Sequence, residues 1–133
     1  MTSILLVDDE PGVNDIGTMI LENQGYEVTA LYGGPEALAL FRKQPRAFDL
    51  VITDYMMPEM KGDELAFRLR GIRQDLPVIL CTGYGVPAGA LEKWGIEALL
   101  EKPYSIREMT CLVRDILAGT GRKTIPGIAS KNL

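Results

Sequence analysis

Short apolar runs alternate with amphipathic segments along this 133-residue chain, and that alternation restricts the fold more than any other feature. Three of the runs are almost continuous valine, isoleucine and leucine, which is typical of strands covered on both faces. The predicted strands are Ser3–Val7, Glu27–Leu31, Asp49–Thr53, Pro77–Cys81 and Glu97–Leu100. A segment with helical spacing follows each of them, so we expect a parallel sheet with helices on both faces.

The helices are predicted from apolar residues that recur at helical spacing. In the first helix the stripe is Val13, Ile16 and Ile20. Further stripes predict helices around Ala37–Phe41, Leu65–Ile72, Ala90–Trp94 and Ile106–Leu117. Ser105 with Glu108 three residues later forms a capping-box pattern, which predicts the start of the last helix.

Composition excludes several classes of protein. The net charge of −4 argues against a nucleic-acid-binding surface. No apolar run approaches the ~20 residues of a transmembrane helix, and the start of the chain lacks the pattern of a signal peptide. Cys81 and Cys111 lack metal-ligand spacing, so we expect free thiols in a reducing cytoplasm. The sequence contains no histidine, which excludes imidazole ligands and phosphohistidine chemistry on this chain.

Charge is distributed unevenly and suggests where the folded domain ends. Residues 1–118 carry 18 acidic and 11 basic side chains, whereas residues 119–133 carry three basic side chains and no acidic one. Glycine, serine, threonine and proline are also concentrated in the last fifteen residues. We therefore expect one domain over residues 1–118 and a flexible basic tail or linker over residues 119–133.

Polar residues follow the predicted strands at one edge of the sheet. Asp8 and Asp9 follow the first strand, Asp54 the third, Thr82 the fourth and Lys102 the fifth. Each has an ordinary alternative role as a helix cap, a turn residue or a solvated lysine. Their joint placement favours a site, because parallel α/β sheets bind ligands beyond the carboxyl ends of their strands.

Three carboxylates at one edge need compensation. Two unit charges 4 Å apart repel by about 4 kcal/mol at an effective dielectric of 20, so either one carboxylate is protonated or a cation binds. Oxygen ligands favour Mg²⁺ over zinc, and Mg²⁺ commonly binds phosphate as well. An aspartate can attack phosphorus to form an aspartyl phosphate. The site is therefore predicted to handle a phosphoryl group.

Four motifs carry a resemblance to a known family. LLVDDE, DYMMPEMKG, CTG and EKPY, in this order and spacing, resemble the receiver domain of two-component response regulators over residues 3–118. The resemblance implies a doubly wound, flavodoxin-like (βα)5 domain with strand order 2-1-3-4-5. It also implies a cis peptide bond between Lys102 and Pro103.

The resemblance also implies roles for individual residues. Asp54 resembles the phosphoacceptor, Asp9 the direct Mg²⁺ ligand and Asp8 its water-mediated partner. Met56 is expected to offer its backbone carbonyl to the metal. Thr82 and Lys102 are expected to bind the phosphoryl group.

By the same resemblance, the phosphoryl donor is a sensor histidine kinase or a phosphotransfer domain. The domain is expected to dephosphorylate itself and is otherwise no enzyme. It is expected to reach a downstream protein through its fourth helix, fifth strand and fifth helix, with no direct nucleic-acid or membrane contact. It is either a stand-alone regulator or the receiver module of a hybrid sensor histidine kinase.

Alternatives stay open at this point. Receivers often carry an aromatic residue where this chain has Leu99. A non-phosphorylated interaction module therefore remains an alternative interpretation. A small aspartyl-phosphate phosphatase of the haloacid-dehalogenase type would have an acid at Met56. A flavodoxin-like binding module would not place acids where Asp8 and Asp9 stand, because they repel phosphate.

Overall fold

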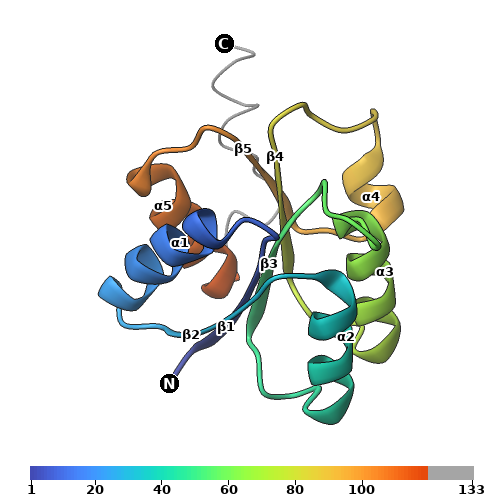
Figure 1. Cartoon of the computed structure of the whole chain (residues 1–133), viewed down its shortest axis with the longest axis horizontal. Coiled ribbons are helices and arrows are strands. Elements are labelled where there is room, and N and C mark those ends of the chain that lie inside the picture. Colours follow the sequence, from blue (N-terminus) through green and yellow to red (C-terminus); the bar gives the residue numbers. More distant parts are fainter. Residues whose placement is uncertain (120–133) are drawn as a thin grey trace.

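The computed structural model describes residues 1–119, which form a five-stranded parallel sheet between two layers of helices (Figure 1). The strands are β1 (Ser3–Val7), β2 (Glu27–Leu31), β3 (Leu50–Asp54), β4 (Val78–Thr82) and β5 (Ala98–Glu101). The helices are α1 (Pro11–Asn23), α2 (Gly34–Lys43), α3 (Gly62–Ile72), α4 (Ala90–Trp94) and α5 (Ile106–Leu117). The strand order is β2-β1-β3-β4-β5, so the predicted doubly wound fold is confirmed.

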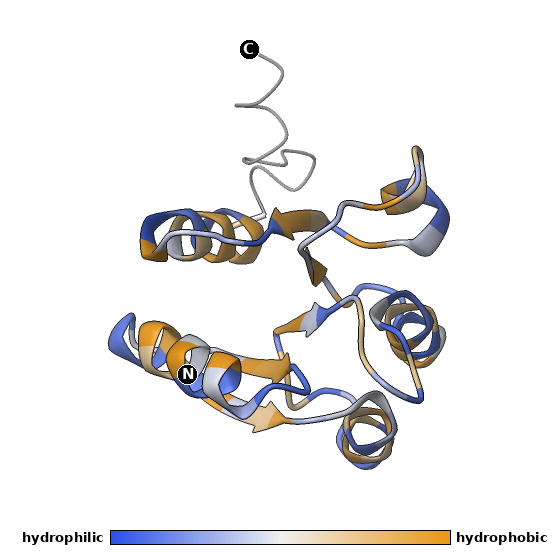
Figure 2. Cartoon of the chain, turned by 45° about the horizontal axis from the view of Figure 1, so that its top comes forward, coloured by the Kyte–Doolittle hydropathy of each residue, from blue (hydrophilic) through white to orange (hydrophobic). Residues whose placement is uncertain are grey.

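Two hydrophobic clusters form the core, one on each face of the sheet. In β1, Leu5 and Val7 pack toward α2, α3 and α4, whereas Ile4 and Leu6 pack toward α1 and α5. Figure 2 shows the hydrophobic strands lying between the two helix layers. Burial on both faces explains why the central strands read as continuous apolar runs rather than as alternating patterns. Among residues 1–119, no helix is long and apolar enough to cross a membrane.

Three strands lie one residue later than predicted. β3, β4 and β5 each begin and end one position further along the chain, so Asp54 and Thr82 are the last residues of their strands. Both continue the parallel pairing, because Asp54 lies opposite Cys81 and Thr82 opposite Glu101. Pairing, rather than side-chain polarity, decides where these strands end.

The buried face of α1 differs from the predicted one. Asn14, Gly17 and Leu21 face the core, while Ile16 is 59% exposed. Gly17 explains the rotation, since a Cβ there would lie 2.9 Å from Cδ2 of Leu6. The helix therefore packs closely along a glycine, and part of its apolar stripe faces outward.

The ends of α4 and α5 match their sequence signals. The Ser105 hydroxyl accepts a hydrogen bond from the Glu108 backbone, and the Glu108 carboxylate accepts one from the Ser105 backbone. This confirms the capping box. α4 spans five residues between Gly89 and Gly95, whose φ angles of 77° and 68° suit glycine.

Both cysteines are free thiols, as predicted. Cys81 is buried in β4, and burial raises the pKa of its thiol to about 12. Cys111 is half-buried on α5. The predicted tail lies beyond the described residues, apart from its first residue.

Candidate functional site

The three predicted aspartates meet at the carboxyl edge of the sheet, where strand order reverses around β1. Val7 pairs with Thr53, which places Asp8 beside Asp54 at the ends of β1 and β3. One oxygen from each of Asp8, Asp9 and Asp54 lies within 4.8 Å of the others. Parallel pairing thus brings together acids that are 45 residues or more apart in the sequence.

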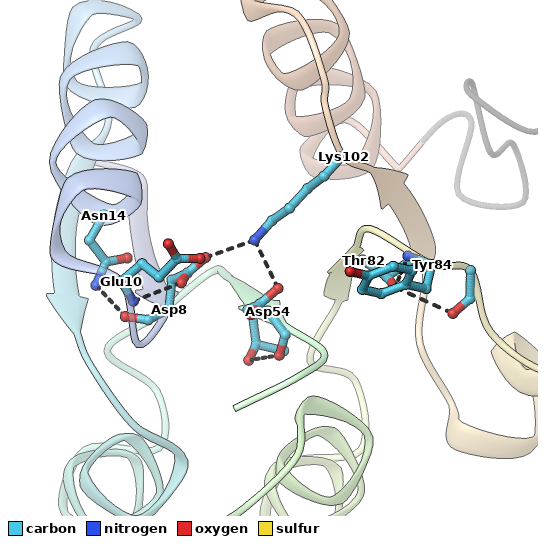
Figure 3. Close-up of polar contacts among 9 residues, drawn as sticks. Asp8, Glu10, Asn14, Asp54, Thr82, Tyr84 and Lys102 are labelled. Carbon is cyan, nitrogen blue, oxygen red and sulfur yellow. Dashed lines mark hydrogen bonds and ion pairs between the residues drawn. The ribbon is translucent and has the colours of Figure 1, made fainter. Parts of the chain in front are cut away.

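Lys102 reaches the same cluster from the end of β5 (Figure 3). Its Nζ donates to Oδ1 of Asp54 at 2.9 Å and to Oδ2 of Asp8 at 3.2 Å. The Lys102–Pro103 peptide bond is cis, as predicted. One ammonium therefore bridges two carboxylates from different strands.

Charge in this cluster is only partly balanced. Burial raises the pKa of Asp54, the Lys102 hydrogen bond opposes that shift, and the negative charge of Asp8 adds to it. Burial acts to lower the pKa of Lys102, but the hydrogen bond and charge of Asp54, with the charge of Asp8, outweigh it and raise that pKa. The raised pKa of Asp54 means that the site favours additional positive charge.

The donor set fits a hard divalent cation. The three clustered groups are all carboxylates, and Mg²⁺ prefers oxygen ligands. Asp8 is further oriented by Glu10, whose backbone N–H donates to Asp8 Oδ1 at 3.0 Å. Asp8 and Asp9 do not cap α1. The N-cap residue of this helix is Glu10, and its side chain makes no capping hydrogen bond.

Thr82 lies at the same sheet edge but is engaged elsewhere. Its hydroxyl donates to the Gly85 carbonyl at 3.3 Å and accepts from the Tyr84 backbone at 3.2 Å. Figure 3 shows Thr82 and Tyr84 lying apart from the Lys102 contacts. The structure thus places Thr82 at the predicted edge while its hydroxyl bonds within its own loop.

The remaining predicted residues surround this arrangement. Met56 follows β3 and is 52% exposed. Leu99 is 1% exposed and belongs to the core cluster beneath α2, α3 and α4. Trp94 packs against Tyr55, with 5.3 Å between the ring centroids. Tyr55 follows Asp54 directly, so α4 contacts the segment that carries the central carboxylate.

Sequence reasoning missed a tight backbone contact at Gly62. A Cβ at this position would lie 2.3 Å from the Asp54 carbonyl oxygen, and the Gly62 N–H donates to the Tyr55 carbonyl at 2.8 Å. Only glycine allows this approach without displacing the main chain of Asp54. The final glycine of DYMMPEMKG was the available signal.

Comparisons with known proteins add independent findings. The model of the family described as "Response regulator receiver domain" matches residues 4–114. Over 119 residues the chain is 34% identical to sensory transduction protein RegX3 of Mycolicibacterium smegmatis, covering 88% of this chain and 51% of RegX3. Over 122 residues it is 34% identical to sensor kinase CckA of Brucella abortus, covering 86% of this chain and 12% of CckA.

Solved structures show the same similarity. The response regulator TrrA of Thermotoga maritima, solved in complex with Mg²⁺-BeF, superposes with a TM-score of 0.78 at 33% identity. The match covers 86% of this chain and 97% of TrrA. The chain spans about half the length of RegX3 and a small part of CckA. The similarity is therefore to one domain of these longer proteins.

Proposed function

Because the chain belongs to the response regulator receiver domain family, we propose that Asp54 accepts a phosphoryl group from a phosphohistidine on another protein. The observation that carries this proposal is the cluster of Asp54 with Asp8, Asp9 and the ammonium of Lys102. A nucleophilic carboxylate, an oxygen-rich cation site and a positive side chain are the groups that phosphoryl transfer to an aspartate needs.

In the transfer, an oxygen of the Asp54 carboxylate attacks phosphorus. The bond between phosphorus and the histidine nitrogen breaks, and its electron pair stays on that nitrogen. Lys102, 2.9 Å from Oδ1 of Asp54, exchanges this contact for the oxygens of the arriving phosphoryl group. Water later hydrolyses the aspartyl phosphate, which returns Asp54 to its carboxylate form.

Mg²⁺ is the cation that this donor set suits. The carboxylates of Asp8, Asp9 and Asp54 and the backbone carbonyl of Met56 would hold it. When bound, it supplies positive charge that offsets the charge of the phosphoryl oxygens. The raised pKa of Asp54 supports this assignment, because burial and the nearby charge of Asp8 both disfavour its carboxylate form, and a bound cation would offset them.

The output is a change of surface. The Thr82 hydroxyl leaves the Gly85 carbonyl and donates to the phosphoryl oxygen, which draws the loop after β4 inward. This alters the face formed by α4, β5 and α5, where a downstream protein binds. Leu99 is packed in the core and has no ring to reorient, so the β4–α4 loop carries the change.

The partners follow from the same chemistry. The sequence contains no histidine, so the phosphohistidine belongs to a sensor kinase or a phosphotransfer domain. A match to one part of a sensor kinase and to about half of a sensory transduction protein supports both contexts, a hybrid kinase and a separate regulator. The domain acts in the cytoplasm as a relay module, and its only catalysis is on its own aspartate.

Phosphorylation with a small-molecule donor tests the proposal. Acetyl phosphate with Mg²⁺ is expected to add one phosphoryl group, detected by intact-protein mass spectrometry, and Asp54→Asn is expected to abolish it. Asp49→Asn is the matched control, because Asp49 precedes the same strand at the opposite edge of the sheet, where its carboxylate accepts from Ser3. Folded wild-type protein that gains no phosphoryl group, or gains it in Asp54→Asn, would contradict the proposal and favour the non-phosphorylated interaction module.

A second test addresses the metal alone. We expect Asp9→Asn to weaken Mg²⁺ binding at least about tenfold in isothermal titration calorimetry, because one charged ligand is lost. Glu10→Gln, the next residue along the chain and outside the cluster, is expected to bind Mg²⁺ like the wild type. Unchanged affinity in Asp9→Asn would remove Asp9 from the metal site.

A further inference from the structure

Asn14 is a buried polar side chain that the proposed mechanism does not use. It lies in the first turns of α1 and is 1% exposed. Its Nδ2 donates to the carbonyl oxygens of Asp8 and Leu31, each at 2.9 Å (Figure 3 includes the Asp8 bond). The Leu31 carbonyl also accepts from the Asp8 backbone N–H at 3.1 Å. One amide therefore joins α1 to the ends of β1 and β2.

These contacts enclose the acidic segment that begins the site. The Asn14 backbone N–H donates to the Glu10 carbonyl at 3.1 Å, while its side chain holds the Asp8 carbonyl. Asp9 lies between these two anchored carbonyls. Among residues 1–119, no hydrogen bond to the Asp9 carboxylate is found, so the position of that carboxylate depends on its main chain.

An amide is an unusual side chain for this buried position. The other buried positions on α1 are Gly17 and Leu21, and an apolar side chain would be the ordinary neighbour on that face. Oδ1 of Asn14 is buried and has no hydrogen-bond partner among the described residues. An unpaired buried acceptor opposes folding. The hydrogen bond from the amide to the Asp8 carbonyl fixes the position of the main chain at Asp8.

We propose that Asn14 is a positioning residue, which holds the Asp8–Asp9 main chain so that both carboxylates face Asp54 and can share a divalent cation. This inference rests on the proposed function, because it assigns the metal to the same acids. Asn14 itself is not a ligand in this arrangement. Groups that orient ligands in this way change metal affinity by about 10–100-fold when they are removed.

Asn14→Leu tests the inference, since leucine has a similar shape and no N–H donors. In calorimetry we expect Mg²⁺ affinity to fall at least about tenfold. Leu21→Ala is the matched control, because Leu21 lies on the same buried face of α1 and its loss lowers stability without touching the acids. Urea unfolding is measured for both variants, and Leu21→Ala is expected to keep Mg²⁺ affinity within about twofold of the wild type.

Two further variants keep the test decisive. Asn14→Gln retains both donors and is expected to bind Mg²⁺ more tightly than Asn14→Leu does. If Asn14→Leu fails to fold, Asn14→Ser, with a single side-chain donor, is expected to bind Mg²⁺ more weakly than both the wild type and Leu21→Ala. Wild-type affinity in folded Asn14→Leu or Asn14→Ser would overturn the positioning role, as would equal losses in Asn14→Leu and Leu21→Ala.

The outcome also separates this inference from the proposed function. Wild-type protein that binds no Mg²⁺ would contradict the proposed function itself. Mg²⁺ binding that is lost in Asp9→Asn but unchanged in Asn14→Leu would overturn only the role of Asn14.

Discussion

The two halves of the site are held in very different ways. In the charged half, Lys102 joins Asp8 and Asp54 through charged contacts of 3.2 and 2.9 Å between separate strands. The other half is the loop between β4 and α4, called the β4–α4 half below. There the Thr82 hydroxyl bonds to Gly85 and Tyr84 of its own loop, at 3.3 and 3.2 Å, and Tyr84 is 95% exposed.

This difference bears on how firmly each half is held. Charge-assisted contacts between buried groups are about twice as strong as neutral ones, so the charged half is organised before a ligand arrives. Local neutral bonds in an exposed loop are exchanged at small cost. Under the proposed function, the chemistry would take place in the charged half and the movement in the β4–α4 half.

Removing the Lys102 ammonium should have the largest effect on both phosphorylation and stability, because it holds the charged half together. Lys102→Gln leaves two buried carboxylates without compensation, and we expect the phosphorylation rate to fall about 100-fold. The free energy of unfolding should fall by about 2 kcal/mol at pH 7 without Mg²⁺, less than for a fully buried pair, because the Lys102 side chain is 25% exposed. Mass-spectrometric time courses and urea unfolding measure the two effects, with Lys93→Gln on α4 as the control.

Crowding the main chain of Asp54 should disturb the charged half through packing. In Gly62→Ala the new Cβ would meet the Asp54 carbonyl, and we expect a loss of about 1–3 kcal/mol in urea unfolding together with slower phosphorylation. Gly71→Ala, on the same helix with nothing within 4 Å, should gain about 0.5–1 kcal/mol. Equal stability of the two variants would show that the contact at Gly62 is not restrictive.

Neutralising Asp54 should raise the stability of the charged half at neutral pH. Its pKa is raised in the folded protein, so the stability linked to this group is present below its ordinary pKa of 3.8 and is lost as pH rises through the folded value. Asp54→Asn should therefore be more stable than the wild type at pH 7 without Mg²⁺, and this advantage should shrink toward about pH 4. Urea unfolding at the two pH values measures it, and an advantage that grows on acidification would contradict the raised pKa.

Removing the Thr82 hydroxyl should have the smallest effect on the resting protein. In Thr82→Ala we expect a loss of about 1 kcal/mol in urea unfolding and Mg²⁺ affinity within about twofold of the wild type. In the wild type we expect phosphorylation to change the fluorescence of Trp94, which packs on Tyr55 beside Asp54, and in Thr82→Ala this change should be lost because α4 would no longer follow the loop. Thr110→Ala is the control, because the Thr110 hydroxyl also donates to a carbonyl of its own helix. A large loss of Mg²⁺ affinity would place Thr82 in the charged half instead.

The topology could be predicted because strands buried on both faces require continuous apolar runs and a helix after each run. The buried face of α1 could not be predicted. Gly17 has no side chain and so lets Leu6 approach the helix closely, and hydrophobic spacing does not reveal such a contact. The one-residue shift of β3 and β4 was missed because the predicted strands were ended at the last apolar or strand-forming residue. Asp54 and Thr82 are polar, but both still pair with the neighbouring strand.

The grouping of the site residues at one edge of the sheet was also predictable. The carboxyl ends of the parallel strands meet there, and the site residues lie at or directly after those ends: Asp8, Asp9, Asp54, Thr82 and Lys102. The bonds of Thr82 within its own loop depend on loop geometry that no spacing reveals. Asn14 was overlooked because it stands among the residues of a helical stripe, where only its contacts distinguish it.

The two cysteines have a practical consequence. In the folded protein, a thiol-specific reagent should label Cys111 on α5 and leave Cys81 intact, since the Cys81 thiol is buried and stays protonated at neutral pH. The Cys81 side chain lies in the core cluster beneath α1 and α5, so any slow labelling of it would report how often that helix layer leaves the sheet. A ligand that tightens the edge of the sheet should lengthen that labelling time.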